Sequence, residues 1–130
     1  MIVLIVPFYA ALLALFYIVL SVRVVRLRRR EKVAVGDGDS MRLRRAIRVH
    51  GNFAEYVPLT LLLLTFVEMQ GASLTTVHAL CIMLLIGRVV HACGVSREKE
   101  DYRLRAAGML LTFASIAVSA VILAGSFIFG

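Results

Sequence analysis

The chain has 130 residues and a mass of 14.4 kDa, a length that fits one domain. Hydrophobic residues make up 61% of it and the mean hydropathy is +0.90, whereas roughly half of the residues of a typical soluble domain are apolar. This composition excludes an ordinary soluble protein and predicts an all-α membrane protein, with four apolar segments of about 20 residues each.

The net charge of +7 is unevenly distributed. Ten of the fifteen basic residues lie between Arg23 and Arg48, and four more lie between Arg97 and Arg105. Both clusters flank apolar segments, and no helix-turn-helix pattern or interleaving of aromatic and basic residues supports nucleic-acid binding. The positive-inside rule instead places both clusters in the cytoplasm and both termini outside.

The first apolar segment predicts a helix over about residues 2–30. No basic region precedes its apolar core, so we interpret it as a retained helix rather than a signal peptide. A turn-rich stretch at 35–40 follows, and Asp39 or Ser40 is expected to cap the next helix, over 41–69. Pro58 is expected to kink that helix, and Glu68 is interpreted only as a marker of its external boundary.

The short turn at 70–73 predicts that the third helix, over about 74–95, runs antiparallel to the second. A charged loop then leads to a fourth helix, over about 103–129, whose many small residues favour close packing against another helix in lipid. Cys81 and Cys93 lie 12 positions apart in one helix, which excludes a disulfide between them, and they have no metal-ligand spacing. The expected fold is a single domain over 1–130, a four-helix antiparallel membrane bundle.

A polar stripe marks the start of the second helix. Arg48, Asn52 and Glu55 follow the spacing i, i+4, i+7, which places them on one helical face just before a strongly apolar run. Ionisable groups inside a membrane are costly and normally face the bundle interior with a partner. The stripe therefore indicates a ligand-binding site, and the alternative is a purely structural network between helices.

The predicted topology brings further polar residues to the same cytoplasmic end. Arg88 and His91 lie near the end of the third helix, and Arg103 and Arg105 lie at the start of the fourth. Several guanidinium groups with one carboxylate and one amide suit a ligand that carries two carboxylates and an ammonium group, because arginine binds carboxylates with a bidentate fork. Glutathione fits this description.

At these residues the sequence resembles a known family. Arg48, Asn52, Glu55, Tyr56 and Pro58 match the signature R-x-x-x-N-x-x-E-Y-x-P of the membrane-associated proteins in eicosanoid and glutathione metabolism (MAPEG). The helix order and the basic first loop match as well. The resemblance covers essentially the whole chain and is greatest to the short bacterial members.

This resemblance implies a homotrimer in the bacterial inner membrane, with glutathione bound between subunits near the cytoplasmic face. The thiolate of the bound glutathione would attack a lipophilic electrophile, and no metal would be needed. The residues that the resemblance assigns to glutathione binding are Arg26, Arg48, Asn52, Glu55 and Tyr56. The third helix departs from the better-known members, which carry tyrosines facing the tripeptide there, and Arg88 and His91 are expected to replace those contacts. Either Arg105 or Arg103 would stabilise the thiolate.

The expected function is thus a glutathione transferase or peroxidase of detoxification, with glutathione as co-substrate. Its partners would be other copies of itself, membrane lipids and a lipophilic small molecule. The alternative is a non-catalytic lipid- or ligand-binding protein on the same scaffold. A small multidrug exporter is less favoured, because its first helix would need an embedded carboxylate and residues 1–22 contain none.

Overall fold

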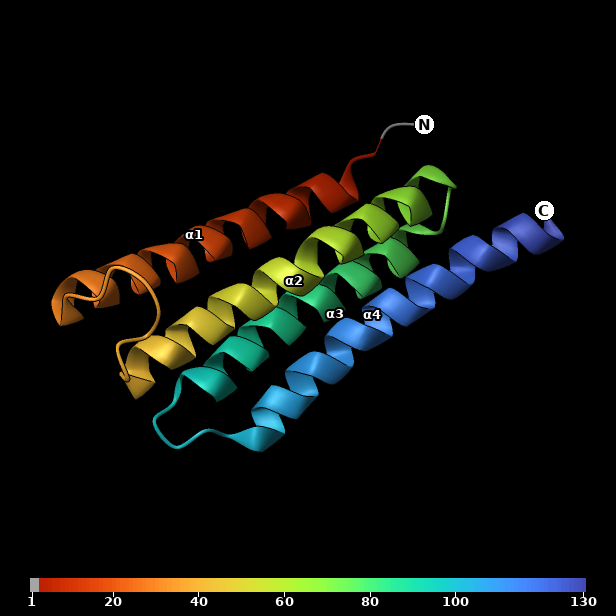
Figure 1. Cartoon of the computed structure of the whole chain (residues 1–130). Coiled ribbons are helices and arrows are strands. Elements are labelled where there is room, and N and C mark those ends of the chain that lie inside the picture. Colours follow the sequence, from red (N-terminus) through yellow and green to blue (C-terminus); the bar gives the residue numbers. More distant parts are fainter. Residues whose placement is uncertain (1–2) are drawn as a thin grey trace.

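The computed structural model describes residues 3–130 and contains four long helices: α1 (Ile5–Glu31), α2 (Met41–Met69), α3 (Leu74–Ser96) and α4 (Tyr102–Phe129) (Figure 1). No strand occurs between residues 3 and 130. Each helix is long and apolar enough to cross a membrane. The four predicted helices are confirmed with closely similar bounds. Only the predicted start of the first helix, at residue 2, lies outside the described residues.

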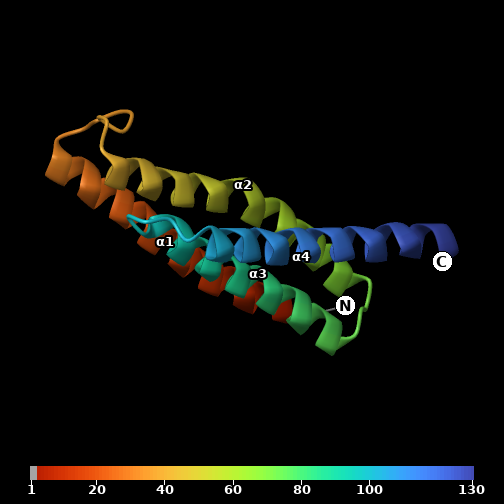
Figure 2. The same ribbon diagram turned by 90° about the horizontal axis from the view of Figure 1, so that it is seen from below.

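Successive helices run antiparallel, so the start of α1 and the end of α4 lie at one end of the bundle and the 32–40 and 97–101 loops lie at the other (Figure 1). Helix α1 packs on α2 and α3, and α4 packs on α3 and α2, whereas α1 and α4 are not in contact. Fully buried aliphatic side chains such as Leu13, Leu64 and Leu84 form the shared core. The C-terminal part of α4 extends past the bundle (Figure 2).

A capping side chain and residues with positive φ angles form the turn before α2. Ser40 is the residue that caps α2, since its Oγ accepts a hydrogen bond from the backbone N–H of Leu43 at 3.2 Å. Gly36, Gly38 and Asp39 have positive φ angles in the preceding turn, a conformation that glycine and aspartate tolerate. Pro58 lies inside α2 as expected, and this helix changes direction partway along its length (Figure 2).

Glu68 has a larger role than that of a boundary marker. Its carboxylate accepts hydrogen bonds from the backbone N–H groups of Leu4, Ile5 and Val6 at 2.7–2.9 Å, and its side chain is buried. These groups are the first amides of α1, which have no partner within the helix. The sequence interpretation was wrong here because a cap supplied from a distant helix leaves no local pattern.

Helices α3 and α4 approach each other closely at Gly87 and Gly108. A Cβ atom built on Gly108 would lie 2.6 Å from the carbonyl oxygen of Gly87 and 2.6 Å from the backbone N of His91. Further along the same interface, the hydroxyl of Ser115 donates to the carbonyl of Leu80 at 3.1 Å. The small residues predicted to let helices approach therefore do so at Gly108 and Ser115, and this packing fixes His91 against α4.

Candidate ligand-binding site

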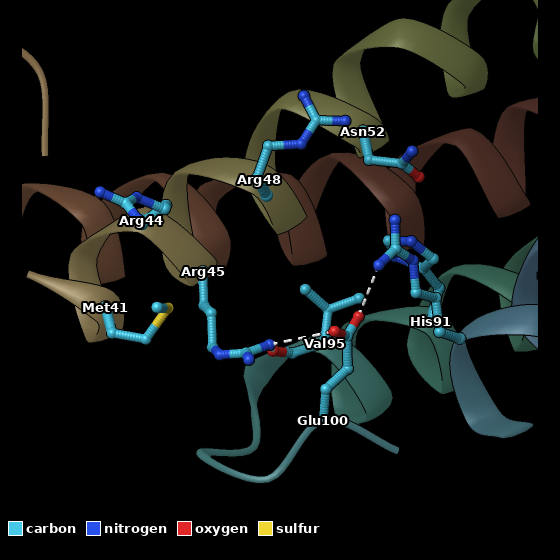
Figure 3. A pocket seen from close by; sticks show the side chains of 9 residues that line it. Met41, Arg44, Arg45, Arg48, Asn52, His91, Val95 and Glu100 are labelled. Atoms are coloured by element: carbon cyan, nitrogen blue, oxygen red, sulfur yellow. Dashed lines mark hydrogen bonds and ion pairs between the residues drawn. The ribbon is translucent and has the colours of Figure 1, made fainter. Parts of the chain in front are cut away.

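A cavity of about 180 Å³ lies at the loop end of the bundle, between the first turns of α2, the last turns of α3 and the start of α4 (Figure 3). It is open on one side. Nine residues line it: Met41, Arg44, Arg45, Arg48, Asn52, His91, Val95, Glu100 and Arg105. Four of the nine are arginines and one is an acid, so the cavity is strongly positive.

The arginines are held in place by the structure around them. Arg45 donates to the carbonyl oxygen of Val95 at 3.3 Å and lies 3.4 Å from Glu100, so it ties α2 to the end of α3 (Figure 3). Arg105 donates to Glu100 at 2.7 Å. Arg44 forms an ion pair with Asp37, and this hydrogen bond holds the pKa of the Asp37 carboxyl below its ordinary value.

The inner end of the cavity is formed by Asn52, whose position is set by Arg88. The Oδ1 atom of Asn52 accepts a hydrogen bond from Nη1 of Arg88 at 2.5 Å. Arg88 is 2% exposed, and its second Nη atom lies 3.3 Å from the sulfur of Met109. No carboxylate among residues 3–130 forms an ion pair with Arg88, and its Nε atom has no hydrogen-bond partner there. This is an uncompensated positive charge directly behind the cavity.

Tyr56 supports this buried arginine rather than lining the cavity. The centre of the Arg88 guanidinium lies 5.9 Å from the Tyr56 ring centroid, within the range of a cation–π contact. On α4, Phe113 packs edge-on against the same ring, with 5.5 Å between the centroids. The tyrosine thus helps to place Arg88 and, through it, Asn52.

Glu55 and Arg48 form an ion pair along α2, with 3.6 Å between Nη1 and Oε1. Both side chains are more than half exposed within one chain. Of the two, only Arg48 lines the cavity. An exposed pair of this kind contributes little to stability, which leaves both groups available to a ligand or to another surface.

The structure therefore brings together four of the residues predicted from sequence, namely Arg48, Asn52, His91 and Arg105. Arg88 and Tyr56 lie behind them, and Glu55 lies beside Arg48. Two predicted residues lie elsewhere in the same chain: Arg26 lines a separate basic groove along α1, and Arg103 lines a shallow depression formed by the 97–101 loop.

Sequence reasoning missed three charged residues of the cavity. Arg44 and Arg45 both lie on α2. Arg45 could have been predicted from its spacing, because it precedes Arg48 by three residues and Asn52 by seven and therefore lies on the same helical face. Glu100 lies in an irregular loop, where no periodicity reports the direction of a side chain.

Comparison with known proteins agrees with this architecture. The MAPEG family model matches residues 6–125 of the chain. The inner membrane protein YecN of Escherichia coli K12 is 43% identical over 108 residues, which cover 83% of this chain and 81% of that protein, and YecN of Escherichia coli O6:H1 matches equally well. No solved structure matches significantly. Four membrane-length helices, the signature on α2 and the family match together show that this integral membrane protein belongs to the MAPEG family.

Proposed function

We propose that this protein binds glutathione in the arginine-lined cavity and transfers its thiolate to lipophilic electrophiles. The observation that carries the proposal is that Arg45, Arg48 and Arg105 line one cavity together with Asn52 at the loop end of the bundle. The two carboxylates of glutathione suit the guanidinium groups, and its ammonium group suits the exposed carboxylate of Glu55. The family match supports the same class of ligand.

The chemistry assigned to Arg105 is stabilisation of the thiolate. A free cysteine thiol has a pKa of about 8.5, so only a small fraction is ionised at neutral pH. A guanidinium beside the sulfur favours the anion, at about 1.4 kcal/mol per pKa unit. The thiol proton passes to solvent, the sulfur forms a bond to the electrophilic carbon, and the leaving group departs with its bonding electrons. Arg105 lines the cavity and Arg103 does not, which favours Arg105 for this role.

Assembly into a homotrimer is part of the proposal. The cavity of one chain is small and open, and Arg26 lies on a different flank of the same chain. In a symmetric ring, a neighbouring copy would bring its own Arg26 toward the cavity and complete the ligand contacts. The inner-membrane location is inferred from the name of the YecN relatives, and the cytoplasmic position of the cavity from the basic loops beside it.

A second candidate function, ligand binding without catalysis, is favoured by one observation. Arg105 is already engaged by Glu100 at 2.7 Å, and an arginine that stays neutralised in this way stabilises a thiolate less. In this case the protein would bind an anionic or lipid ligand and not turn it over.

The test is calorimetric titration of glutathione into the purified full-length protein in detergent, followed by turnover of a halonitroarene electrophile. Arg48→Ala is expected to weaken binding at least tenfold, as expected for the loss of one charge-assisted contact. Arg105→Ala should abolish turnover, whereas Arg103→Ala, which makes the same change of charge two residues away and outside the cavity, should retain both properties. Absence of binding by the wild type at millimolar glutathione would overturn the proposal. Binding without turnover would favour the second candidate.

A further inference from the structure

Glu100 is the only acid among the residues that line the cavity, and it occupies a distinctive position there. Its Oε1 atom accepts from Arg105 of α4 at 2.7 Å, and its Oε2 atom lies 3.4 Å from Nη1 of Arg45 of α2. The side chain is only 10% exposed, although it comes from the 97–101 loop. One loop carboxylate therefore joins two helices across the cavity (Figure 3).

The contacts of Glu100 are those that the carboxylate of a ligand would make. Arg45 and Arg105 each offer guanidinium donors to a single carboxylate, and a second carboxylate placed on them would lie within a few ångströms of the first. Two like charges at that separation repel each other strongly in a partly enclosed site. A ligand carboxylate and Glu100 are therefore expected to exclude each other.

The loop allows Glu100 to leave without unfolding a helix. The next residue, Asp101, carries the cap of α4, because its carboxylate accepts from the backbone N–H groups of Arg103 and Leu104. The backbone N–H of Asp101 also donates to the carbonyl oxygen of Gly94 at 3.2 Å. These bonds hold the start of α4 independently of Glu100, so the Glu100 side chain can rotate outward while α4 stays in place.

We propose that Glu100 is an internal competitor for the ligand: it holds Arg45 and Arg105 in the empty cavity and is displaced when a carboxylate-bearing ligand binds. The inference rests on the proposed function for the identity of that ligand. It adds a residue that sets the affinity of the site. It also gives the loop two positions, one with Glu100 inside an empty cavity and one with Glu100 outside a filled cavity.

The experiment compares wild type with Glu100→Gln, which removes the charge and keeps the shape, and with Glu100→Asp, whose shorter side chain cannot span both arginines. The matched control is Glu98→Gln, an exposed acid of the same loop that makes no ion pair within residues 3–130. Glutathione and inorganic sulfate serve as separate probes in calorimetric titrations of the full-length protein. Hydrogen–deuterium exchange of the 97–101 amides reports on the loop.

We expect Glu100→Gln to bind both probes about three- to tenfold more tightly than wild type, the range for one or two partly exposed ion pairs. The affinity of Glu100→Asp should lie between those of wild type and Glu100→Gln. Without ligand, the backbone amides of the 97–101 loop should exchange faster in Glu100→Gln than in wild type. Glutathione should speed the exchange of these amides in the wild type only. Glu98→Gln should match wild type throughout.

The outcomes separate this proposal from the proposed function. Equal glutathione affinity in wild type and Glu100→Gln would overturn the role of Glu100 and leave the glutathione site standing. Tighter sulfate binding by Glu100→Gln, with no glutathione binding by any variant, would support the competitor and refute the function. If no variant binds either probe, both proposals fail.

Discussion

Arg88 and Asn52 form a buried contact between α3 and α2: the guanidinium Nη1 donates to the amide Oδ1 across 36 positions of sequence. Because Asn52 is a neutral acceptor and no carboxylate among residues 3–130 pairs with Arg88, the positive charge of this buried side chain is not neutralised by an ion pair there. Such a charge is costly in a membrane protein, and an anion in the adjacent cavity would lower that cost. We therefore expect the stability of the bundle and the binding of an anion in the cavity to be linked through this pair.

The first prediction follows from this link. Asn52→Asp should place a carboxylate on Arg88 and raise the melting temperature, but it should weaken glutathione binding at least tenfold, because it adds a negative charge and removes the amide donors. Asn52→Leu should lower both the melting temperature and the glutathione affinity, since it leaves Arg88 buried without its acceptor. The free energy of unfolding should fall by roughly 3–5 kcal/mol. Thermal unfolding and calorimetric titration of the same samples measure the two effects. Parallel changes in stability and affinity for Asn52→Asp would contradict the link.

The second prediction concerns the close approach of α4 to His91. Gly108→Ala should destabilise the protein by about 1–3 kcal/mol, because the new methyl group would overlap the backbone of α3. It should also disturb His91 and weaken ligand binding. Gly125→Ala is the control, since a Cβ there meets no atom within 4 Å, and it should raise stability by roughly 0.4–1 kcal/mol. Denaturant titration followed by circular dichroism compares the two, and equal effects would show that the contact is unimportant.

The third prediction tests the distant cap of α1. Glu68→Ala should remove the acceptor of three backbone N–H groups and cost about 1–3 kcal/mol, with little change in glutathione affinity because the cavity lies at the opposite end of the bundle. Cys81 is fully buried, so its reaction with a thiol-specific fluorophore on heating reports unfolding, in a background that carries Cys93→Ser. Glu55→Gln, an exposed acid of the same helix, should leave this unfolding temperature unchanged.

The fourth prediction is a dependence on pH. Burial by itself raises the pKa of Glu100, but the hydrogen bonds and charges of Arg105 and Arg45 outweigh it, so the pKa lies below the ordinary value of 4.5. A carboxyl group whose pKa is lower in the folded state contributes stability above its unfolded pKa and loses it as the pH falls through the folded value. Acidification from neutral pH to about pH 3 should therefore lower the melting temperature of wild type more than that of Glu100→Gln. Identical pH profiles would show that Glu100 gains nothing from the two arginines.

The helices and the polar face of α2 were predictable because their signals are local. Apolar runs of membrane-spanning length predicted the four helices, and the spacing of Arg48 and Asn52 predicted the face of α2 that lines the cavity. The antiparallel order then placed His91 and Arg105 at the same end. Glu100 and Glu68 were not predictable in their roles, since each depends on where a carboxylate meets a distant element. The separation of Arg26 from the cavity likewise required the three-dimensional packing of α1.

The carboxylate of Glu68 also constrains the order in which the chain can enter the bilayer. The first amides of α1 are satisfied by a residue near the end of α2, more than sixty positions later. Until that residue is synthesised, these amides can donate only to water or to lipid headgroups, because the hydrocarbon offers no acceptor. The start of α1 must therefore stay at the aqueous boundary during synthesis, and the α1–α2 hairpin is the smallest part of the chain that can insert fully with these groups satisfied.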